Sequence, residues 1–155
     1  MRKCAKLLAK NHYCISFIES ATCGYLAYRF GLTPQSGKIL VGGLVCYDLK
    51  VKKNVLGVPH KLVKKHSPES LAVTEALARR APKLFACDIY VACTGLLKRG
   101  GSETKDKPVG TFFYSILYQD KIYNQRCYCT GTHQEKLDKV LKKICKTLIK
   151  LIKKH

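Results

Sequence analysis

Acidic residues are scarce in this chain. Its 155 residues include 10 Asp and Glu against 29 Lys and Arg, which gives a formal net charge of +19 at pH 7. A charge of this size favours anionic partners, namely nucleotides, nucleic acids or an acidic membrane surface. Most of the excess is lysine on the expected helix faces, so a solvated, solubilising lysine surface is the alternative interpretation.

The sequence also lacks the cysteine and histidine spacings of a metal site. No two cysteines form C-x-x-C, and Cys127 and Cys129, two residues apart, are expected on opposite faces of a strand. An odd number of cysteines without a signal peptide argues against a disulfide framework. We therefore expect no metal, no cofactor and reduced thiols in a cytoplasmic protein. The residues concerned are Cys4, Cys14, Cys23, Cys46, Cys87, Cys93, Cys127, Cys129 and Cys145, with His12, His60, His66, His133 and His155.

Long apolar runs are missing as well. The basic N-terminal segment is interrupted by Lys6, Lys10, Asn11 and His12, so it resembles neither a signal peptide nor a membrane span. We find no internal repeat, low-complexity tract or second-domain boundary. A chain of this length can bury one hydrophobic core, which predicts a single domain over residues 1–155.

Strand-like and helix-like segments alternate along the chain. This order predicts a three-layer α/β/α domain, and a hairpin near its end predicts a mixed, mostly parallel sheet. Residues 31–37 are expected to form a loop, and a short basic segment runs through His66. The expected strands are 14–18, 39–47, 87–94, 108–118 and 122–129, and the expected helices are 3–12, 25–30, 48–56, 70–80 and one from about 134.

The last helix has an apolar stripe from Leu137 to Ile152, and lysines occupy the rest of its surface. This spacing is typical of a helix that packs on a core and exposes a solvated lysine face. Binding to a membrane surface or to nucleic acid is the alternative.

Three loops of small residues, 19–24, 42–48 and 94–101, follow three of the expected strands. If these strand ends meet at one edge of the sheet, one pocket collects Ser20, Thr22, Tyr47, Lys52 and Thr94. A lysine can activate a serine if burial or a neighbouring cation lowers the lysine pKa. The chain has no G-x-S-x-G motif, P-loop or full G-x-G-x-x-G motif.

Glu19, at the end of the first buried strand, allows two interpretations. Its carboxylate can face the pocket and orient or neutralise Lys52. It can also bind nearby backbone N–H groups and hold the loop, and both can be true together.

Four motifs in this order resemble the CinA C-terminal domain family, whose members include nicotinamide-nucleotide amidases. E-S-A-T-C-G at 19–24 is similar to E-S-x-T-G-G, and V-G-G-L-V-C-Y at 41–47, followed by Lys52 and V-L-G-V at 55–58, is similar to G-G-x-x-x-Y…K…L-L-G-V. A-C-T-G at 92–95 and K-P-V-G-T at 107–111 match the strand end A-x-T-G and the strand start K-P-V-G-T. The resemblance covers about residues 5–150, and the pyrophosphatase-like domain of longer members is absent from this sequence.

The resemblance implies hydrolysis of the carboxamide of nicotinamide mononucleotide to nicotinate mononucleotide and ammonia. It assigns Ser20 as the catalytic hydroxyl, Lys52 as its proton acceptor and Tyr47 as a neighbouring site residue. It implies a small-molecule nucleotide substrate and no metal or cofactor. We also expect a homo-oligomer, no membrane partner and no nucleic-acid partner. The expected substrate-binding residues are Glu19, Thr22, Gly24, Gly42, Gly43, Thr94 and Gly95.

Three positions depart from the family pattern. Cys23 replaces the first glycine of the Gly-Gly pair, L-L-K-R at 96–99 replaces I-A-G-P, and T-H at 132–133 replaces an arginine. A Cβ at position 23 costs about 1 kcal/mol if that position needs a positive φ. The departures keep two alternatives open: a nucleotide-binding homologue with impaired catalysis, and a basic nucleic-acid-associated protein. For the latter the sequence shows no recognition helix or aromatic stacking platform.

Overall fold

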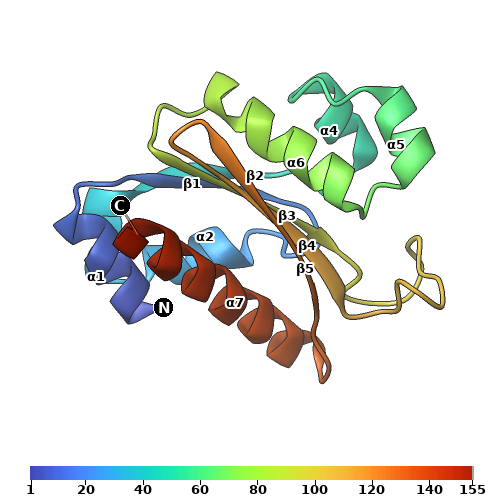
Figure 1. Ribbon diagram of the computed structural model, residues 1–155. Helices are drawn as coiled ribbons and strands as arrows, with labels where there is room; N and C mark the ends of the chain where they lie inside the picture. The colour runs from blue at the N-terminus through green and yellow to red at the C-terminus, as the bar shows by residue number, and fades with distance from the viewer. Residues whose placement is uncertain (155) are drawn as a thin grey trace.

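A five-stranded sheet lies between two layers of helices in the computed structural model, which describes residues 1–154 (Figure 1). The strands follow the order β2-β1-β3-β4-β5; β1 is parallel to β2 and β3, and β4 is antiparallel to β3 and β5. Four strands therefore run in one direction and β4 in the other. This arrangement confirms the predicted three-layer class and its mixed sheet. The strands are β1 (Ile15–Glu19), β2 (Leu40–Val45), β3 (Ile89–Gly95), β4 (Thr111–Tyr118) and β5 (Lys121–Tyr128).

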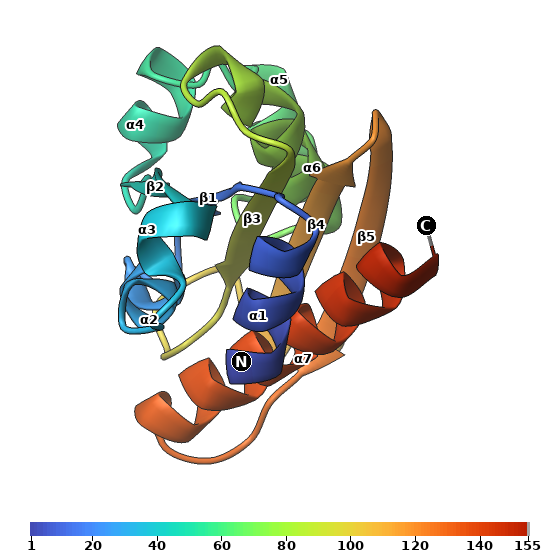
Figure 2. The ribbon, with the colours of Figure 1, turned by 90° about the vertical axis from the view of Figure 1, so that its left-hand side faces the viewer.

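The helices divide between the two faces of the sheet (Figures 1 and 2). On one face Leu8, Phe17, Phe30, Phe112 and Leu148 belong to a core beneath the two terminal helices. The helices of this layer are α1 (Arg2–Lys10), α2 (Tyr25–Gly31), α3 (Ser36–Ile39) and α7 (His133–Lys154). The other layer holds α4 (Leu49–Asn54), α5 (His60–His66), α6 (Leu71–Arg80) and the short 3₁₀ helix η1 (Ala81–Lys83).

The terminal helix packs through its apolar stripe, as its spacing predicted. Val140, Ile144 and Leu148 are fully buried in the core beneath it. Among residues 1–154 no helix combines the length and the apolar character that crossing a membrane requires. His155, one of the histidines considered above, lies outside the described residues.

Two short helices differ from the sequence-based expectation. Part of the expected loop 31–37 and the residues after it form α3, and the basic segment before Ser67 forms α5. Each helix has only one or two turns, too few for an apolar period to be visible in the sequence. The helix α5 is held by tertiary contact, because Val63 is buried in the second core with Leu56 and Leu77.

The carboxyl ends of the three parallel strands meet at one edge of the sheet. Glu19, the last residue of β1, is in register with Val45 of β2 and with Cys93 of β3. The small-residue loops that follow these strands therefore lie next to one another, which is where ligands bind in open α/β sheets.

Candidate functional site

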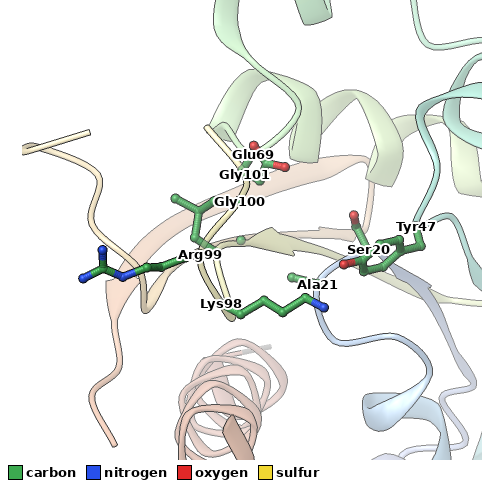
Figure 3. Close-up of a pocket in the computed structure, with 10 residues that line it drawn as sticks. Ser20, Ala21, Tyr47, Glu69, Lys98, Arg99, Gly100 and Gly101 are labelled. Carbon is green, nitrogen blue, oxygen red and sulfur yellow. The ribbon is translucent and has the colours of Figure 1, made fainter. Parts of the chain in front are cut away.

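A cavity of about 200 Å³ opens at this edge of the sheet (Figure 3). In Figure 3, Ser20 and Tyr47 lie at one end of the cavity and the Lys98 side chain extends toward them. The Arg99 side chain extends in the opposite direction. The cavity is lined by Ser20, Ala21, Tyr47, Glu69, Gly95, Leu96, Lys98, Arg99, Gly100 and Gly101.

Ser20 is fixed by its backbone and leaves its hydroxyl unused. Its N–H donates to Cys93 O at 3.0 Å, and its carbonyl accepts from Cys23 N at 3.1 Å. Only 8% of the residue is exposed, and within residues 1–154 no hydrogen bond engages its Oγ. The hydroxyl is therefore available at the cavity wall.

Lys52 is a buried lysine that is held by two backbone carbonyls. Its Nζ donates to Cys46 O at 2.6 Å and to Tyr47 O at 3.0 Å, and the residue is 2% exposed. Burial lowers the pKa of its amine below the usual value, and this is only partly opposed by Cys46, Glu69 and Asp48.

Ser20 and Lys52 are neighbours through the backbone rather than through their side chains. Cys46 N donates to Glu19 O at 2.7 Å, so the segment that holds the Lys52 amine is bonded to the residue just before Ser20. Within the described residues no hydrogen bond joins Ser20 Oγ to Lys52 Nζ. A rotation of the lysine side chain or an intervening water is needed for proton transfer between them.

Glu19 holds the loop through backbone groups. Its carboxylate accepts from Leu26 N at 3.0 Å and from Ala27 N at 2.8 Å, in the first turn of α2. Only 1% of the residue is exposed. Of the two interpretations considered for Glu19, the structure shows the backbone-binding one, and no ion pair with Lys52 is formed among residues 1–154.

The turn after Ser20 adopts left-handed backbone conformations. Cys23 has φ +48° and Gly24 has φ +88°, so the position of the family's first glycine does require a positive φ. The Cys23 side chain is exposed and does not line the cavity. Thr22 is 2% exposed, and its Oγ1 has no hydrogen-bond partner in the described part of the chain.

The remaining expected substrate-binding residues lie near the cavity, but most of them contact other residues of the protein instead of lining it. Gly43 lies within β2, where a Cβ would come within 3.4 Å of the Ala27 side chain; at Gly42 it would meet Phe85. Thr94 is fully buried and shares a hydrogen bond of 2.7 Å with Thr74.

Gly95 lines the cavity wall. A Cβ at Gly95 would lie 2.5 Å from the Phe112 ring, so this position requires glycine for packing.

A hydrogen-bond network beside the cavity was not expected from the sequence. Lys107 Nζ donates to Ser102 Oγ at 2.6 Å, to Ser67 Oγ at 2.7 Å and to Glu69 O at 3.0 Å. Ser102 Oγ in turn donates to the Glu69 carboxylate. This network folds the loop after β3 back onto the start of α6 and places Glu69 at the cavity. Lys107 in the K-P-V-G-T motif was the only sequence signal for it.

No group of three or more His, Cys, Asp or Glu residues suited to hold a metal ion is found within residues 1–154. The cationic groups at the cavity are Lys98 and Arg99, both from the segment that departs from the family pattern. The cavity wall thus offers a hydroxyl, backbone N–H groups, the Glu69 carboxylate and two cations, and the buried Lys52 amine lies beside it.

Comparison with known proteins identifies the same family that the sequence motifs resemble. The family model described as CinA C-terminal domain matches residues 1–154. A CinA-like protein of Prochlorococcus marinus is 41% identical over 104 residues, which are 67% of this chain and 24% of that protein. A CinA-like protein of Mycobacterium avium is 40% identical over 112 residues, 72% of this chain and 25% of that protein. The chain thus spans about a quarter of the length of these curated relatives.

Solved structures share the fold. A competence-damaged protein (CinA) superfamily protein from Klebsiella pneumoniae superposes with a TM-score of 0.91 at 22% identity, over 99% of this chain and 96% of that chain. A competence/damage inducible protein from Agrobacterium tumefaciens gives a TM-score of 0.87 at 21% identity, over 97% of this chain and 94% of that chain. At these identities the structures establish the fold alone.

Proposed function

The chain belongs to the CinA C-terminal domain family, and from this premise we propose that it is a nicotinamide-nucleotide amidase. The reaction hydrolyses the carboxamide of nicotinamide mononucleotide and yields nicotinate mononucleotide and ammonia. One observation carries the proposal: the unused hydroxyl of Ser20 faces a cavity, and the backbone beside it holds a buried amine of lowered pKa. On the nine thiols of the sequence we also propose a cytoplasmic location.

The hydrogen bonds of Lys52 are compatible with a neutral amine. A neutral amine has two N–H groups and one lone pair, and two carbonyls accept hydrogen bonds from Lys52 in the structure. The lone pair then remains to accept the Ser20 proton. In the proposed reaction the amine takes this proton while Ser20 Oγ attacks the carboxamide carbon.

The oxyanion that forms on attack needs hydrogen-bond donors. The N–H of Ala21, the residue after the proposed nucleophile, donates to no group within residues 1–154 and lies at the cavity wall. The N–H in this position serves the oxyanion in other serine hydrolases. Collapse of the tetrahedral intermediate transfers the proton from Lys52 to the leaving nitrogen, releases ammonia and leaves an ester on Ser20. Water then hydrolyses the ester to the carboxylate and restores the hydroxyl.

The volume of the cavity suits the carboxamide-bearing ring of the nucleotide, and the positive charge beside the cavity suits its phosphate. Its volume of about 200 Å³ is below the range of about 300–1,000 Å³ that encloses a drug-sized ligand. We therefore place the carboxamide-bearing ring inside the cavity beside Ser20 and the phosphate outside, toward Arg99, whose side chain extends away from Ser20. Cationic side chains at this position favour the phosphate electrostatically.

The test is ammonia release from nicotinamide mononucleotide by the purified protein. We expect activity in the wild type and its loss in Ser20→Ala and in Lys52→Met, which keeps the shape of the buried side chain. Lys53→Met is the matched control, because Lys53 is the exposed neighbour on the same helix, and it keeps full activity. Full activity in Ser20→Ala would overturn the assigned site.

A nucleotide-binding homologue without turnover is the second candidate. It is favoured by Cys23 at a left-handed position and by the missing hydrogen bond between Ser20 and Lys52. Calorimetry distinguishes the two candidates. Binding of nicotinamide mononucleotide without ammonia release supports the second, and turnover by the wild type excludes it.

A further inference from the structure

The segment that leads to Lys98 is fixed to the sheet. Leu96 N donates to Thr111 O at 2.9 Å, and Leu96 O accepts from Gly110 N at 2.6 Å. Leu96 is also 2% exposed, so it is held by packing as well as by its backbone. Lys98 follows two residues later, and the path of the chain to it therefore starts from a fixed point at the cavity wall.

The segment that follows Lys98 is held as well. The N–H groups of Gly100 and Gly101 donate to the Glu103 carboxylate at 2.9 Å and 2.8 Å. Lys98 and Arg99 lie between the two anchored segments, and Figure 3 shows their side chains extending in opposite directions. The direction of Lys98 into the cavity is therefore tied to a short stretch of chain that is held at both of its ends.

The Lys98 cation has no partner in the described part of the chain. Within residues 1–154 no hydrogen bond or ion pair engages its side chain. Glu69 is the only acid among the residues that line the cavity, but its carboxylate accepts a hydrogen bond from Ser102, and Figure 3 shows it apart from Lys98. An unpaired cation that extends toward an unused hydroxyl favours a ligand group on which negative charge develops.

Negative charge develops at this place in the proposed amidase reaction. Attack of Ser20 Oγ on the carboxamide carbon moves an electron pair of the C=O bond onto the oxygen, while Lys52 takes the Ser20 proton. The N–H of Ala21 offers one donor to this oxyanion, and serine hydrolases generally use two donors. A second donor is therefore needed beside Ser20, and Lys98 is the cation that extends toward it.

We propose that Lys98 is a further catalytic residue, whose Nζ donates a hydrogen bond to the oxyanion formed from the carboxamide oxygen. This inference rests on the proposed amidase function. Lys98 keeps its protons throughout, so the Ser20 proton still passes through Lys52 to the leaving nitrogen. Lys98 lies in the segment L-L-K-R at 96–99, which departs from the family pattern I-A-G-P, so this role belongs to this chain rather than to the pattern.

The charge of the substrate separates the roles of the two cations. The pyridinium ring of nicotinamide mononucleotide is itself positive, so Lys98 does not attract the bound ring before the reaction. The attraction appears only when the carboxamide oxygen becomes negative, and an interaction made only in the transition state raises kcat instead of lowering KM. Arg99 extends away from Ser20 toward the proposed phosphate position. It contacts the phosphate before and during the reaction, and it therefore acts on KM.

Steady-state kinetics of ammonia release test this separation. In Lys98→Met, kcat is expected to fall about a hundredfold while KM does not rise. In Arg99→Met, KM is expected to rise about tenfold at unchanged kcat, and this effect disappears on nicotinamide riboside, which lacks the phosphate. Lys105→Met is the matched control and keeps both constants, because Lys105 is an exposed lysine of the same loop that does not line the cavity. An unchanged kcat in Lys98→Met overturns the proposal.

Binding of pyridine-3-boronic acid tests Lys98 without turnover. Ser20 Oγ forms a bond to boron, which keeps its two hydroxyl groups, and the Ser20 proton passes to Lys52. The product is a tetrahedral anion that resembles the reaction intermediate. By calorimetry we expect Lys98→Met to bind this compound at least about tenfold more weakly than the wild type.

The two measurements distinguish a failure of this proposal from a failure of the amidase proposal. A wild type that binds the boronic acid but releases no ammonia contradicts the amidase activity, and the affinity ratio then still decides whether Lys98 stabilises a tetrahedral anion on Ser20. Equal affinity in the wild type and Lys98→Met overturns the role of Lys98. So does a wild type that forms no adduct at Ser20.

Discussion

Cys23→Gly is expected to stabilise the protein by removing strain from the turn after Ser20. Cys23 has φ +48°, in the left-handed region. This conformation costs an L-residue roughly 1–2 kcal/mol of conformational free energy, because its Cβ approaches the following carbonyl oxygen. Glycine avoids this contact but loses about 0.5–1 kcal/mol more through the entropy of the unfolded chain. The side chain is exposed, so its removal sacrifices little burial.

The net gain is therefore about 0.5–1 kcal/mol in the free energy of unfolding. For a chain of this length, 1 kcal/mol corresponds to about 2–4 °C in the melting temperature. We expect Cys23→Gly to melt about 2–3 °C higher and to unfold at a higher urea concentration with an unchanged slope.

Cys23→Ala is the matched control for this measurement. It removes the same thiol but keeps the Cβ that causes the strain, so its stability is expected to stay within about 0.5 kcal/mol of the wild type. Equal stabilisation in Cys23→Ala and Cys23→Gly would show that the thiol, not the backbone, limits stability. A loss of stability in Cys23→Gly would refute the strain argument itself.

Two further predictions concern the cavity wall and the buried amine. Gly95→Ala is expected to lower the free energy of unfolding by about 2–3 kcal/mol, because the new Cβ would lie 2.5 Å from the ring of the fully buried Phe112. Urea denaturation measures this change. Gly37→Ala is the control that does not lose stability, because nothing lies within 4 Å of a Cβ at that position. For Lys52, burial holds the folded-state pKa below the usual 10.5, so between these two values the unfolded chain binds more protons and stability rises with pH. Wild-type stability should therefore increase relative to Lys52→Met from pH 7 toward pH 10, and parallel pH profiles in urea denaturation would contradict the lowered pKa.

The sheet could be predicted from the sequence because its strands have local signals. Continuous apolar runs mark β1 and β3. Asp120 and Lys121 predict the hairpin of β4 and β5, which turns at Gln119 and Asp120, one residue earlier. The 3.6-residue period of the terminal helix marks α7 in the same way. These patterns depend only on neighbours along the chain, so one sequence is enough to read them.

The cavity wall could not be predicted in the same way. Glu69 lies at the cavity because Lys107 and Ser102 bind it. These two contacts join residues more than thirty positions apart, and no period or spacing encodes them. The short helix α5 was missed for a related reason, since its stability comes from the burial of Val63 rather than from its own sequence pattern.

The separation of Glu19 from Lys52 has a chemical consequence. An ion pair between them would stabilise the ammonium form and raise the lysine pKa. The Glu19 carboxylate is instead bound by two N–H groups of α2, and the Lys52 amine is held by two neutral carbonyls. Each buried group is thus satisfied by the backbone alone, which leaves burial as the dominant influence on the Lys52 pKa. The proposed role of Lys52 as general base for Ser20 needs a neutral amine, because only the neutral form can accept a proton, and this arrangement favours the neutral form.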